Sequence, residues 1–536
     1  MKIVLVGMMG AGKTAVGEGL ARRLGVPLLD TDALVEASAG MSIARIFERE
    51  GEQGFRRKER RVVAQAAALE NLVIAAGGGA WMDEKNRELL LAGGARVIRL
   101  FAPAGELLRR LGDAGDRPLL RSLPSKENVE EIMEQREEIY SLAPEQVNTE
   151  GLGVDEVVSR IARGESANLA AGGDAVRLTV AVTDPYEVVV GSALRQKIPE
   201  LLEGAGVLAR RMGLASDHLV WTLYGEGVRD RLEAAGCSVV DWQFPPGEAS
   251  KSLSELGRAY DHFLEGGAER DFPLVALGGG VTGDLIGLAA ATLLRGIPYV
   301  QVPTTLLAQV DSSVGGKVAV NHPRGKNLVG AFYQPRLVLC DVDFLRTLSG
   351  SEFLSGMGEV LKHGIITGGS YLNLLAEQGD RIMERDPEVL LEVVAGSCRI
   401  KAGYVIRDER EGGVRRHLNF GHTLGHAVES ASAGAIPHGV AVAFGMAAAA
   451  RISRYEGHLS AGEARFIEDL LSRWGYPVCI EELPGSPGAD ELLHYLKFDK
   501  KRRDGRTHWV LLRGVGQPLV SGDVPDKTVL RALRGE

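Results

Sequence analysis

A glycine-rich segment near the start of the chain has the spacing of a phosphate-binding loop. It runs from Gly7 to Thr14 in the pattern G-x-x-x-x-G-K-T and directly follows the apolar stretch 3–6, which predicts a buried strand. In such a loop the backbone N–H groups surround phosphates, the amine of Lys13 reaches the β- and γ-phosphates, and the hydroxyl of Thr14 binds Mg²⁺. The alternative, a glycine-rich turn with an unrelated lysine, fits poorly with the preceding strand. The segment therefore predicts a nucleoside triphosphate site.

Acidic and basic residues further along could hold a phosphoryl acceptor. Asp30 and Asp32 follow a second expected strand, where one carboxylate can hold Mg²⁺ and the other can orient or deprotonate an attacking hydroxyl. Arg56 and Arg136 carry guanidinium groups, which bind a carboxylate bidentately. Arg117 lies in a stretch suited to a lid that stabilises the transferring phosphoryl group. Each arginine alone is more often a solvated surface residue, but together they favour a small carboxylated acceptor.

A second glycine-rich turn and a basic tract stand near the middle of the chain. The segment Gly278 to Asp284 follows an expected strand at 273–277 and fits the pattern G-x-G-x-x-G of a dinucleotide turn. The acidic residue expected about 20 positions further on is missing, so the pattern does not predict an ordinary dehydrogenase, although it is compatible with nicotinamide binding. The polar tract that follows contains Arg295, Thr304, Thr305, Asp311, Ser312, Ser313, Lys317, Lys326 and Asn327. A single lysine would more often be a solvated loop residue, but this combination predicts a site for an anionic ligand.

Candidate metal ligands are confined to the later part of the chain, because none of the 11 histidines lies within the first 217 residues. Glu359 stands on an expected helix, His422 and His426 are spaced i and i+4, and His438 follows. One carboxylate with two or three imidazoles suits Zn²⁺ with an open position for substrate. A lone histidine would more often be a core or surface residue. The spacing leaves open which of His422 and His426 is a ligand.

The elements that must position these residues divide the chain into units. A length of 536 residues corresponds to three or four domains at about 150 residues each. The segment 163–174 lacks apolar periodicity and is rich in small residues, which predicts a linker. Strands and helices are expected to alternate before it and again after it, which predicts parallel sheets wrapped by helices. The expected parts are a P-loop three-layer α/β unit (1–164), a linker (165–175), an α/β dinucleotide-binding domain (176–345) and a mostly α-helical domain (346–536).

The overall composition is that of an ordinary soluble globular protein, with 45% apolar and 25% charged residues. The net charge of −9 argues against a nucleic-acid-binding surface, and no apolar stretch reaches the length of about 18 residues needed to span a bilayer. The four cysteines include no C-x-x-C pair, and the chain enters its first motif with no room for a signal peptide. We therefore expect a cytoplasmic enzyme with small-molecule substrates and without nucleic-acid or membrane partners.

Residues 1–164 closely resemble the shikimate kinase family, whose motifs G-x-x-x-x-G-K-T, D-x-D, G-E-x-x-F-R, G-G-G, R-P-L-L and R-x-x-x-Y stand here in order. The resemblance implies transfer of phosphate from ATP, with Mg²⁺, to the 3-hydroxyl of shikimate. It implies an ATP site formed by Gly10, Ala11, Gly12, Lys13, Thr14, Arg110 and Arg117, with Mg²⁺ held by Thr14 and Asp30. It implies a shikimate site formed by Asp32, Arg56, Gly78 and Arg136, and a catalytic set of Lys13, Asp32 and Arg117.

Residues 176–536 resemble the 3-dehydroquinate synthase family over nearly their full length. The motifs run in family order from P-G-E-x-x-K at 246–251 to D-K-K at 499–501. The resemblance implies NAD- and metal-dependent conversion of 3-deoxy-D-arabino-heptulosonate 7-phosphate to 3-dehydroquinate and phosphate, with Zn²⁺ or Co²⁺ as the metal. An alcohol is oxidised, phosphate is eliminated, the ketone is reduced again and a ring closes, so there is no net redox change. The family is commonly dimeric, which implies a homodimer through this part of the chain.

The same resemblance implies roles for individual residues. It assigns the metal to Glu359, His422 and His438 and places His426 beside the substrate. It lines the substrate pocket with Arg295, Asp311, Lys317, Asn327, Lys362, Lys401, Arg415, Asn419 and Lys501. The implied catalytic residues are Lys317, Asn327, Lys362, Lys401, Arg415, Asn419 and His426. The implied NAD contacts are Glu248, Lys251, Gly280, Asp284, Thr304, Thr305 and Lys326.

One segment departs from the synthase pattern, and two rival functions fit parts of the sequence. The family has an acidic turn for the adenosine ribose, whereas the corresponding stretch here, 218–225, is short and has no acidic residue. The first rival is a nucleotide-binding regulatory module without kinase chemistry in place of the N-terminal unit; the intact Asp32, Arg56 and Arg136 argue against it. The second is a metal-dependent alcohol dehydrogenase, which would not need the lysine-rich tract. We expect two self-sufficient sites joined by a flexible linker.

Overall fold

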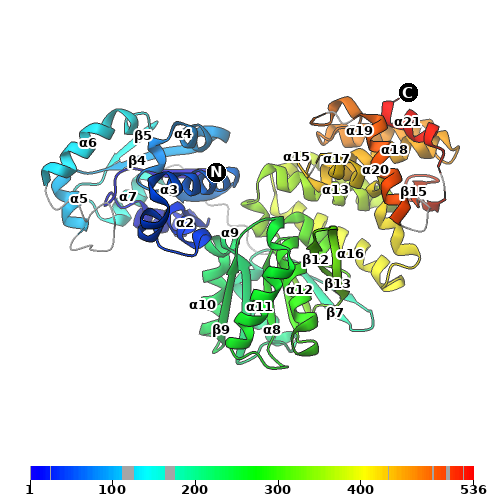
Figure 1. Ribbon diagram of the computed structural model, residues 1–536, viewed down its shortest axis with the longest axis horizontal. Coiled ribbons are helices and arrows are strands. Elements are labelled where there is room, and N and C mark those ends of the chain that lie inside the picture. Colours follow the sequence, from blue (N-terminus) through cyan, green and yellow to red (C-terminus); the bar gives the residue numbers. More distant parts are fainter. Residues whose placement is uncertain are drawn as a thin grey trace.

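The computed structural model describes residues 2–24, 26–111, 126–162, 175–432, 434–485, 488–502, 508–522 and 524–535. They form an N-terminal α/β unit, a central α/β part and a helical C-terminal part, in chain order (Figure 1). The predicted fold class is thereby confirmed. Among these described residues, no helix combines the length and the apolar character needed to cross a membrane.

A five-stranded, all-parallel sheet forms the centre of the N-terminal unit, in the order β2-β3-β1-β4-β5. Its strands are β1 (Lys2–Val6), β2 (Leu28–Asp30), β3 (Leu72–Ala75), β4 (Arg96–Phe101) and β5 (Glu145–Asn148). Its helices are α1 (Lys13–Leu24), α2 (Thr31–Ala39), α3 (Ile43–Ala68), α4 (Glu84–Leu91), α5 (Ala104–Leu111), α6 (Lys126–Tyr140) and α7 (Val154–Ile161). Ile3, Val4 and Leu5 of β1 are fully buried, as expected for branched apolar residues at the centre of a parallel sheet. The carboxyl ends of all five strands therefore meet at one edge, where the phosphate-binding loop follows β1.

The central part contains a seven-stranded sheet in the order β6-β7-β14-β11-β10-β8-β9, parallel except for the edge strand β6. Its strands are β6 (Val176–Val180), β7 (Tyr186–Gly191), β8 (Arg211–Asp217), β9 (Ser238–Phe244), β10 (Leu274–Gly278), β11 (Tyr299–Pro303) and β14 (Leu337–Asp341). The helices between them are α8 (Ile198–Gly204), α9 (His218–Val220), α10 (Glu226–Ala234), α11 (Leu253–Glu265) and α12 (Gly280–Thr292). The strands β8 and β10 are neighbours in the sheet, but the chain continues from them in opposite directions. From β8 it moves outward to β9, and from β10 it moves the other way to β11. The crevice between the ends of β8 and β10 is thus a topological switch point, where α/β sheets bind ligands.

Two segments of the central part differ from their sequence-based interpretation. The polar tract after β11 includes an antiparallel hairpin, β12 (Lys317–His322) and β13 (Gly325–Phe332). The stretch 218–225 is helical, formed by α9 and the wider turn η4 (Trp221–Gly225), and the strand β8 ends just before it at Asp217. The strand does therefore end in an acidic residue, so the expectation of a missing acidic turn, which rested on 218–225 alone, was wrong. The sequence pattern did not predict β8, so the expected turn began one residue too late.

The C-terminal part is a bundle of helices with one small hairpin. Its helices are α13 (Gly350–Thr367), α14 (Gly369–Glu377), α15 (Gly379–Met383), α16 (Pro387–Arg407), α17 (His422–Ala431), α18 (His438–Tyr455), α19 (Ala461–Arg473), α20 (Ala489–Arg502) and α21 (Asp526–Arg534). The hairpin, β15 (Trp509–Leu512) and β16 (Pro518–Ser521), was not predicted. The central helix α18 is buried almost throughout, from Gly439 to Ser453 apart from Val440, because its small and apolar residues face neighbours on every side.

Candidate active sites

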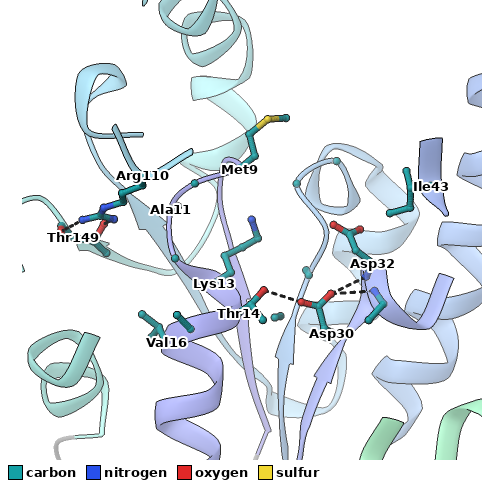
Figure 2. Close-up of a pocket in the computed structure, with 18 of the residues that line it drawn as sticks. Met9, Ala11, Lys13, Thr14, Val16, Asp30, Asp32, Ile43, Arg110 and Thr149 are labelled. Atoms are coloured by element: carbon teal, nitrogen blue, oxygen red, sulfur yellow. Dashed lines mark hydrogen bonds between the residues drawn. The ribbon is translucent and has the colours of Figure 1, made fainter. Parts of the chain in front are cut away.

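The phosphate-binding loop opens into a cavity of about 1080 Å³ at the carboxyl edge of the first sheet (Figure 2). Gly10 and Gly12 have φ angles of 81° and 89°, in the left-handed region that glycine adopts without strain. The hydroxyl of Thr14 donates a hydrogen bond of 2.8 Å to the carboxylate of Asp30. The two predicted Mg²⁺ ligands therefore lie side by side. Lys13 projects from the loop into the same cavity (Figure 2).

Two glycines after β3 make room for side chains on the acceptor side of this cavity. A methyl group on Gly77 would lie 2.2 Å from Oδ1 of Asp32, and one on Gly79 would lie 2.2 Å from Nη1 of Arg56. The guanidinium of Arg56 donates a 2.7 Å hydrogen bond to the buried carboxylate of Glu59, one turn along α3. Burial raises the pKa of Glu59, and its pairing with Arg56 offsets this only in part. The pair fixes the orientation of the arginine.

Arginines from two further helices complete the walls of the cavity. Arg136 and the buried Tyr140 lie one turn apart on α6; the hydroxyl of Tyr140 donates a 2.6 Å hydrogen bond to the carbonyl of Gly78, which lies 3.5 Å from Nη1 of Arg136. Arg110 on α5 donates hydrogen bonds of 2.9 and 2.6 Å to the hydroxyl and carbonyl of Thr149 (Figure 2). Arg136 thus stands on the acceptor side and Arg110 on the nucleotide side.

The structure brings together nearly all of the predicted N-terminal site residues. The cavity is lined by Gly10, Ala11, Gly12, Lys13, Thr14, Asp30, Asp32, Arg56, Gly78, Arg110 and Arg136. The predicted lid residue Arg117 lies outside the described residues. The motifs did not single out Glu59, although its position three residues after Arg56 on a helix was a usable signal.

A carboxylate and two imidazoles meet in the C-terminal part. The donor atoms of Glu359, His422 and His438 all lie within 4.8 Å of one another. Nε2 of His422 and Nε2 of His438 lie 3.6 and 3.4 Å from Oε1 of Glu359. This donor set fits a Zn²⁺ site that keeps an open position. His426 lies one turn further along α17, with its ring centre 5.4 Å from that of His422, so the fold brings His422 rather than His426 to Glu359.

Close helix packing allows these short side chains to meet. A methyl group on Gly439, the residue after the third ligand, would lie 1.8 Å from the carbonyl oxygen of Ser355 on α13. One on Gly445 of α18 would lie 1.9 Å from the carbonyl oxygen of Gly421, just before α17. Glycines therefore let the backbones of α13 and α17 approach α18 more closely than any larger residue would permit.

The cluster is electrostatically suited to a cation. Burial disfavours the ionised form of Glu359, but Lys362, His422 and His438 outweigh burial and hold its pKa well below the ordinary value. Burial also disfavours the charged form of His438, but its contacts with Glu359 and Glu429 raise its pKa to about 10. A metal ion that binds here must therefore displace a proton from His438.

The affinity for Zn²⁺ is expected to rise with pH. The pKa of His438 is raised to about 10, whereas that of His422 is lowered to about 3 by burial and then by Lys362. About one proton is thus released per ion near neutral pH, and the dissociation constant should fall about tenfold per pH unit between about pH 6.5 and 8.5. Competition with a chromophoric chelator at several pH values measures this slope. An affinity that does not change with pH would contradict it.

A second carboxylate, Glu429, holds the ring of His438 from behind. Its Oε2 lies 3.3 Å from Nδ1 of His438, and its Oε1 lies 3.8 Å from Nζ of Lys326 on the hairpin. A carboxylate on the far nitrogen of a metal-binding imidazole fixes the ring and strengthens the ligand. The motifs did not single out Glu429. Its spacing from His422 and His426, at i, i+4 and i+7 on one helix face, was the available signal.

The Glu429→Gln variant is expected to bind Zn²⁺ about 10- to 100-fold more weakly, because an amide neither holds the ring nor raises its basicity as a carboxylate does. Equilibrium dialysis of the metal measures the change. The matched control is Glu456→Gln, at an exposed position just after α18, which should bind Zn²⁺ as the unaltered chain does. Equal affinities for both variants would rule out this role for Glu429.

The cationic residues predicted to bind substrate adjoin the metal cluster. Lys362, on α13, donates a hydrogen bond to Glu359. Lys401, on α16, forms an ion pair with Asp311. Burial disfavours ionisation of Asp311, but the ammonium of Lys401 outweighs it and holds the pKa of the carboxyl well below its ordinary value. Asp311, Glu359 and His363 form a second group of side chains that could hold a metal ion. This group shares Glu359 with the group of Glu359, His422 and His438.

A second set of predicted substrate residues lies around the start of the hairpin. Lys317 forms an ion pair with Glu411, which also accepts a 2.8 Å hydrogen bond from the amide of Asn419. The guanidinium of Arg415 donates to the carbonyl of Gly315 at 3.1 Å, and a methyl group on that glycine would lie 2.3 Å from Nη2. The cationic side chains thus come from the hairpin, from α13 and α16 and from the segment before α17.

For three more of the predicted substrate residues, the structure gives the conformation of the backbone or the element alone. Arg295 and Asn327 have φ angles of 70° and 56°, which are uncommon for residues with side chains. Such strained conformations cluster at functional sites. Lys501 lies on α20.

The predicted dinucleotide contacts gather at the switch point of the second sheet. The turn after β10 begins α12, and the N–H of Thr304 donates a 3.0 Å hydrogen bond to the carbonyl of Gly278. Asp284 on α12 forms an ion pair with Lys251; burial raises the pKa of its carboxyl, and Lys251 offsets this in part. Glu248 accepts a 2.7 Å hydrogen bond from the amide of Asn321, which joins it to the hairpin. A methyl group on Gly279 would lie 3.1 Å from Thr305, and one on Gly280 would lie 3.2 Å from Ser312.

Asp217 closes β8 on the other side of the same crevice. Its carboxylate accepts hydrogen bonds of 2.9 and 3.0 Å from the N–H groups of Leu219 and Val220, and burial raises its pKa to about 6. The edge that carries the glycine-rich turn therefore also carries a carboxylate, in the place where one was expected and thought missing.

The fold and the two sites define a two-part enzyme, a P-loop phosphotransferase followed by an α/β and helical unit with a potential metal centre. The shikimate kinase family profile matches residues 9–164, and profiles for the N- and C-terminal domains of 3-dehydroquinate synthase match residues 241–355 and 356–502. The chain belongs to the 3-dehydroquinate synthase family, and its N-terminal unit belongs to the shikimate kinase family. It is a bifunctional enzyme of the shikimate pathway, with kinase and lyase activities.

Individual relatives and solved structures support this assignment. The chain is 49% identical over 314 residues to the 3-dehydroquinate synthase of Pelobacter propionicus. The aligned residues make up 58% of this chain and 86% of that protein. The chain is 46% identical to the 3-dehydroquinate synthase of Symbiobacterium thermophilum over 65% of this chain and 98% of the relative. Among solved structures, the 2-epi-5-epi-valiolone synthase ValA of Streptomyces hygroscopicus, with NAD⁺ and Zn²⁺ bound, superposes with a TM-score of 0.60 at 29% identity, over 65% of this chain and 95% of its own.

Proposed function

We propose that the N-terminal cavity transfers the γ-phosphoryl group of ATP to the 3-hydroxyl of shikimate. A single cavity that joins the P-loop to Asp32, Arg56 and Arg136 is the observation that carries this proposal. Lys13 balances charge on the transferring phosphoryl group, while Thr14 and Asp30 hold Mg²⁺. The carboxylate of Asp32 accepts the proton of the attacking hydroxyl, and the two arginines bind the shikimate carboxylate.

The Gly79→Ala variant is expected to raise the KM for shikimate about tenfold with little change in the KM for ATP, because the added methyl displaces the guanidinium of Arg56. The variant should also be less stable by about 1–3 kcal/mol, because the displaced guanidinium leaves the buried carboxylate of Glu59 without its partner. Steady-state kinetics with each substrate varied in turn measures the two constants. The matched control is Gly105→Ala, because a methyl group at this position, near the start of α5, meets open space. Gly94→Ala would not serve, because the φ of 71° at Gly94 strains an alanine. Equal KM values for shikimate in both variants would contradict the expected role of Gly79.

We propose that the second site converts 3-deoxy-D-arabino-heptulosonate 7-phosphate to 3-dehydroquinate and phosphate, with NAD⁺ and Zn²⁺ or Co²⁺. NAD⁺ supplies a reversible hydride acceptor, and the divalent metal supplies a Lewis acid for the substrate hydroxyls. Glu359, His422 and His438 hold the metal, while the turn at Gly278–Gly280 accommodates the dinucleotide. The 2-deoxy-scyllo-inosose synthase, solved with carbaglucose-6-phosphate, NAD⁺ and Co²⁺, is 27% identical with a TM-score of 0.59, over 68% of this chain and 99% of its own.

The identity of the substrate is supported by the relatives and by the charges in the pocket. The named 3-dehydroquinate synthases are 40–49% identical to this chain, whereas the two cyclases with other named products are 27–29% identical. Lys317, Lys362, Lys401 and Arg415 provide cations for the phosphate that leaves and for the carboxylate of the substrate. A simple alcohol dehydrogenase would have no use for so many cations.

Two assays on the full chain test these functions. Purified protein should form shikimate 3-phosphate from ATP and shikimate, and should release phosphate from the heptulosonate 7-phosphate without net accumulation of NADH. Failure to phosphorylate shikimate would favour the rival regulatory module, and accumulation of NADH with simple alcohols would favour a dehydrogenase. The expected homodimer, the cytoplasmic location and the domain boundaries at 164, 175 and 345 stay predictions.

A further inference from the structure

The N-terminal unit packs directly on the central part through apolar side chains. Leu219, on α9, and Leu223, on η4, are partly buried against the core of the N-terminal unit. The helix α9 lies against α2 (Figure 1), and the turn η4 lies against β2. Both leucines follow β8 in the chain, so they are part of the synthase while they extend the core of the kinase.

A polar contact lies beside this apolar one. The N–H of Glu70, in the turn before β3, donates a 3.0 Å hydrogen bond to the carbonyl of Thr347. The amide of Asn71 donates one of 2.6 Å to the carbonyl of Arg346, and the carboxylate of Glu70 lies 3.4 Å from Nη1 of Arg385. Asn71 has a φ of 51°, a conformation that asparagine tolerates better than most residues. The left-handed backbone conformation of Asn71 is therefore part of the turn that contacts Arg346 and Thr347.

A hydrogen bond joins the two contacts into one surface. The hydroxyl of Tyr224, on η4, lies 2.5 Å from the hydroxyl of Thr347, whose carbonyl accepts the N–H of Glu70. We name α9, η4, the segment 346–347 and Arg385 the docking surface. It combines apolar side chains, backbone hydrogen bonds and an ion pair, so it holds the kinase in one orientation and not merely nearby.

The elements that the docking surface holds carry Asp32, the acceptor-side carboxylate, and Asp30, the predicted Mg²⁺ ligand. β2 ends at Asp30, and α2 begins at the next residue and contains Asp32. The carboxylate of Asp30 accepts hydrogen bonds from the N–H groups of Asp32 and Ala33, at 2.9 and 3.3 Å. The nucleotide side is held instead within the N-terminal unit, for example by the bonds of Arg110 to Thr149.

We propose that the docking surface of the synthase positions the segment 28–39 of the kinase and thereby sets its affinity for the phosphoryl acceptor. This proposal rests on the kinase function proposed above. It makes the fused synthase a structural part of the kinase acceptor site, in contrast to two self-sufficient units on a flexible linker. Loss of docking raises the KM for shikimate more than that for ATP, because the P-loop and Arg110 hold the nucleotide from outside the segment 28–39, to which only Asp30 belongs.

The test is the Leu219→Asp variant of the full chain, which places a charge in the apolar contact. Hydrogen exchange in the segment 28–39 should become faster, and the KM for shikimate should rise at least about fivefold while that for ATP stays within about twofold. The control is Leu264→Asp, because Leu264 is 47% exposed at the end of α11. It should match the unaltered chain in both measurements.

A milder variant guards against misfolding. Glu70→Lys places a cation opposite Arg385 and should produce the same changes to a smaller degree, with Glu88→Lys on the exposed side of α4 as its control. Faster exchange with an unchanged KM for shikimate would overturn the proposal, as would unchanged exchange in both variants or an equal rise in both KM values. Absence of shikimate phosphorylation by the unaltered chain would instead overturn the proposed function, and exchange in 28–39 would still report on docking.

Discussion

The Lys13→Ala variant is expected to lose phosphoryl transfer to shikimate by about a thousandfold in kcat while it retains the synthase reaction. Lys13 projects from the P-loop into the cavity that Asp32 and Arg56 also line, and its ammonium reaches the carbonyl oxygens of Gly7 and Met8 at 2.9 and 3.1 Å. A preorganised cation at the transferring phosphoryl group contributes about this much to the rate. A coupled assay for ADP and a phosphate-release assay for the synthase, on one preparation, measure both activities.

The control for this experiment is Lys85→Ala, because Lys85 is exposed on α4 and outside the cavity. It should behave as the unaltered chain in both assays. Full kinase activity in Lys13→Ala would remove the basis for the kinase assignment. Loss of both activities would mean that the substitution disturbs the fold beyond the N-terminal unit.

The His422→Ala variant is expected to lose its bound divalent metal and to lower synthase kcat by at least about a thousandfold, with kinase kcat unchanged. His422 is the first residue of α17, and its imidazole lies 3.6 Å from the carboxylate of Glu359. Removal of this imidazole leaves two protein ligands, whereas catalytic zinc sites have three. His422 is a better choice than Glu359, because removal of that carboxylate would leave the buried ammonium of Lys362 without its partner. Metal analysis after dialysis and the two activity assays measure the outcome.

His458→Ala provides the matched control, because His458 is an exposed histidine after α18. It should keep both the metal and the two activities. Retention of stoichiometric metal by His422→Ala would show that the ion is held elsewhere, for instance around Asp311 and His363. Retained kinase activity in His422→Ala would show that the loss is local to the synthase site.

The fold class was predictable because its signals are local. The apolar run of β1, followed by the glycine-rich loop, is typical of a P-loop fold and fits few other structures. The Ala- and Leu-rich composition after residue 346 predicted the helical bundle. The strand β5 and the hairpin β12–β13 were missed because few of their residues are buried, so they lack the continuous apolar run that marks a central strand. The missed strand β8 led to the error about Asp217.

The chemical types of the candidate site residues were determined by the sequence alone. The order G-x-x-x-x-G-K-T, D-x-D and G-E-x-x-F-R predicted a nucleotide and favoured a carboxylated acceptor, and the histidines confined a transition-metal site to the later part. These residue types can be predicted from the sequence because each chemical step needs particular functional groups. Within a motif, those groups stand only a few residues apart in the chain.

Only the tertiary structure decided how distant residues combine. It brought His422 rather than His426 to Glu359, a choice that the resemblance implied but the spacing left open. It also placed Glu429 behind His438 and packed Leu219 of the synthase against the kinase. These outcomes depend on where α13, α17 and α18 cross and on how two sheets meet, and both are set by the packing of side chains that lie far apart in sequence. Spacing along the chain carries no information about such contacts, because the distance between two helices is fixed by the residues at their crossing.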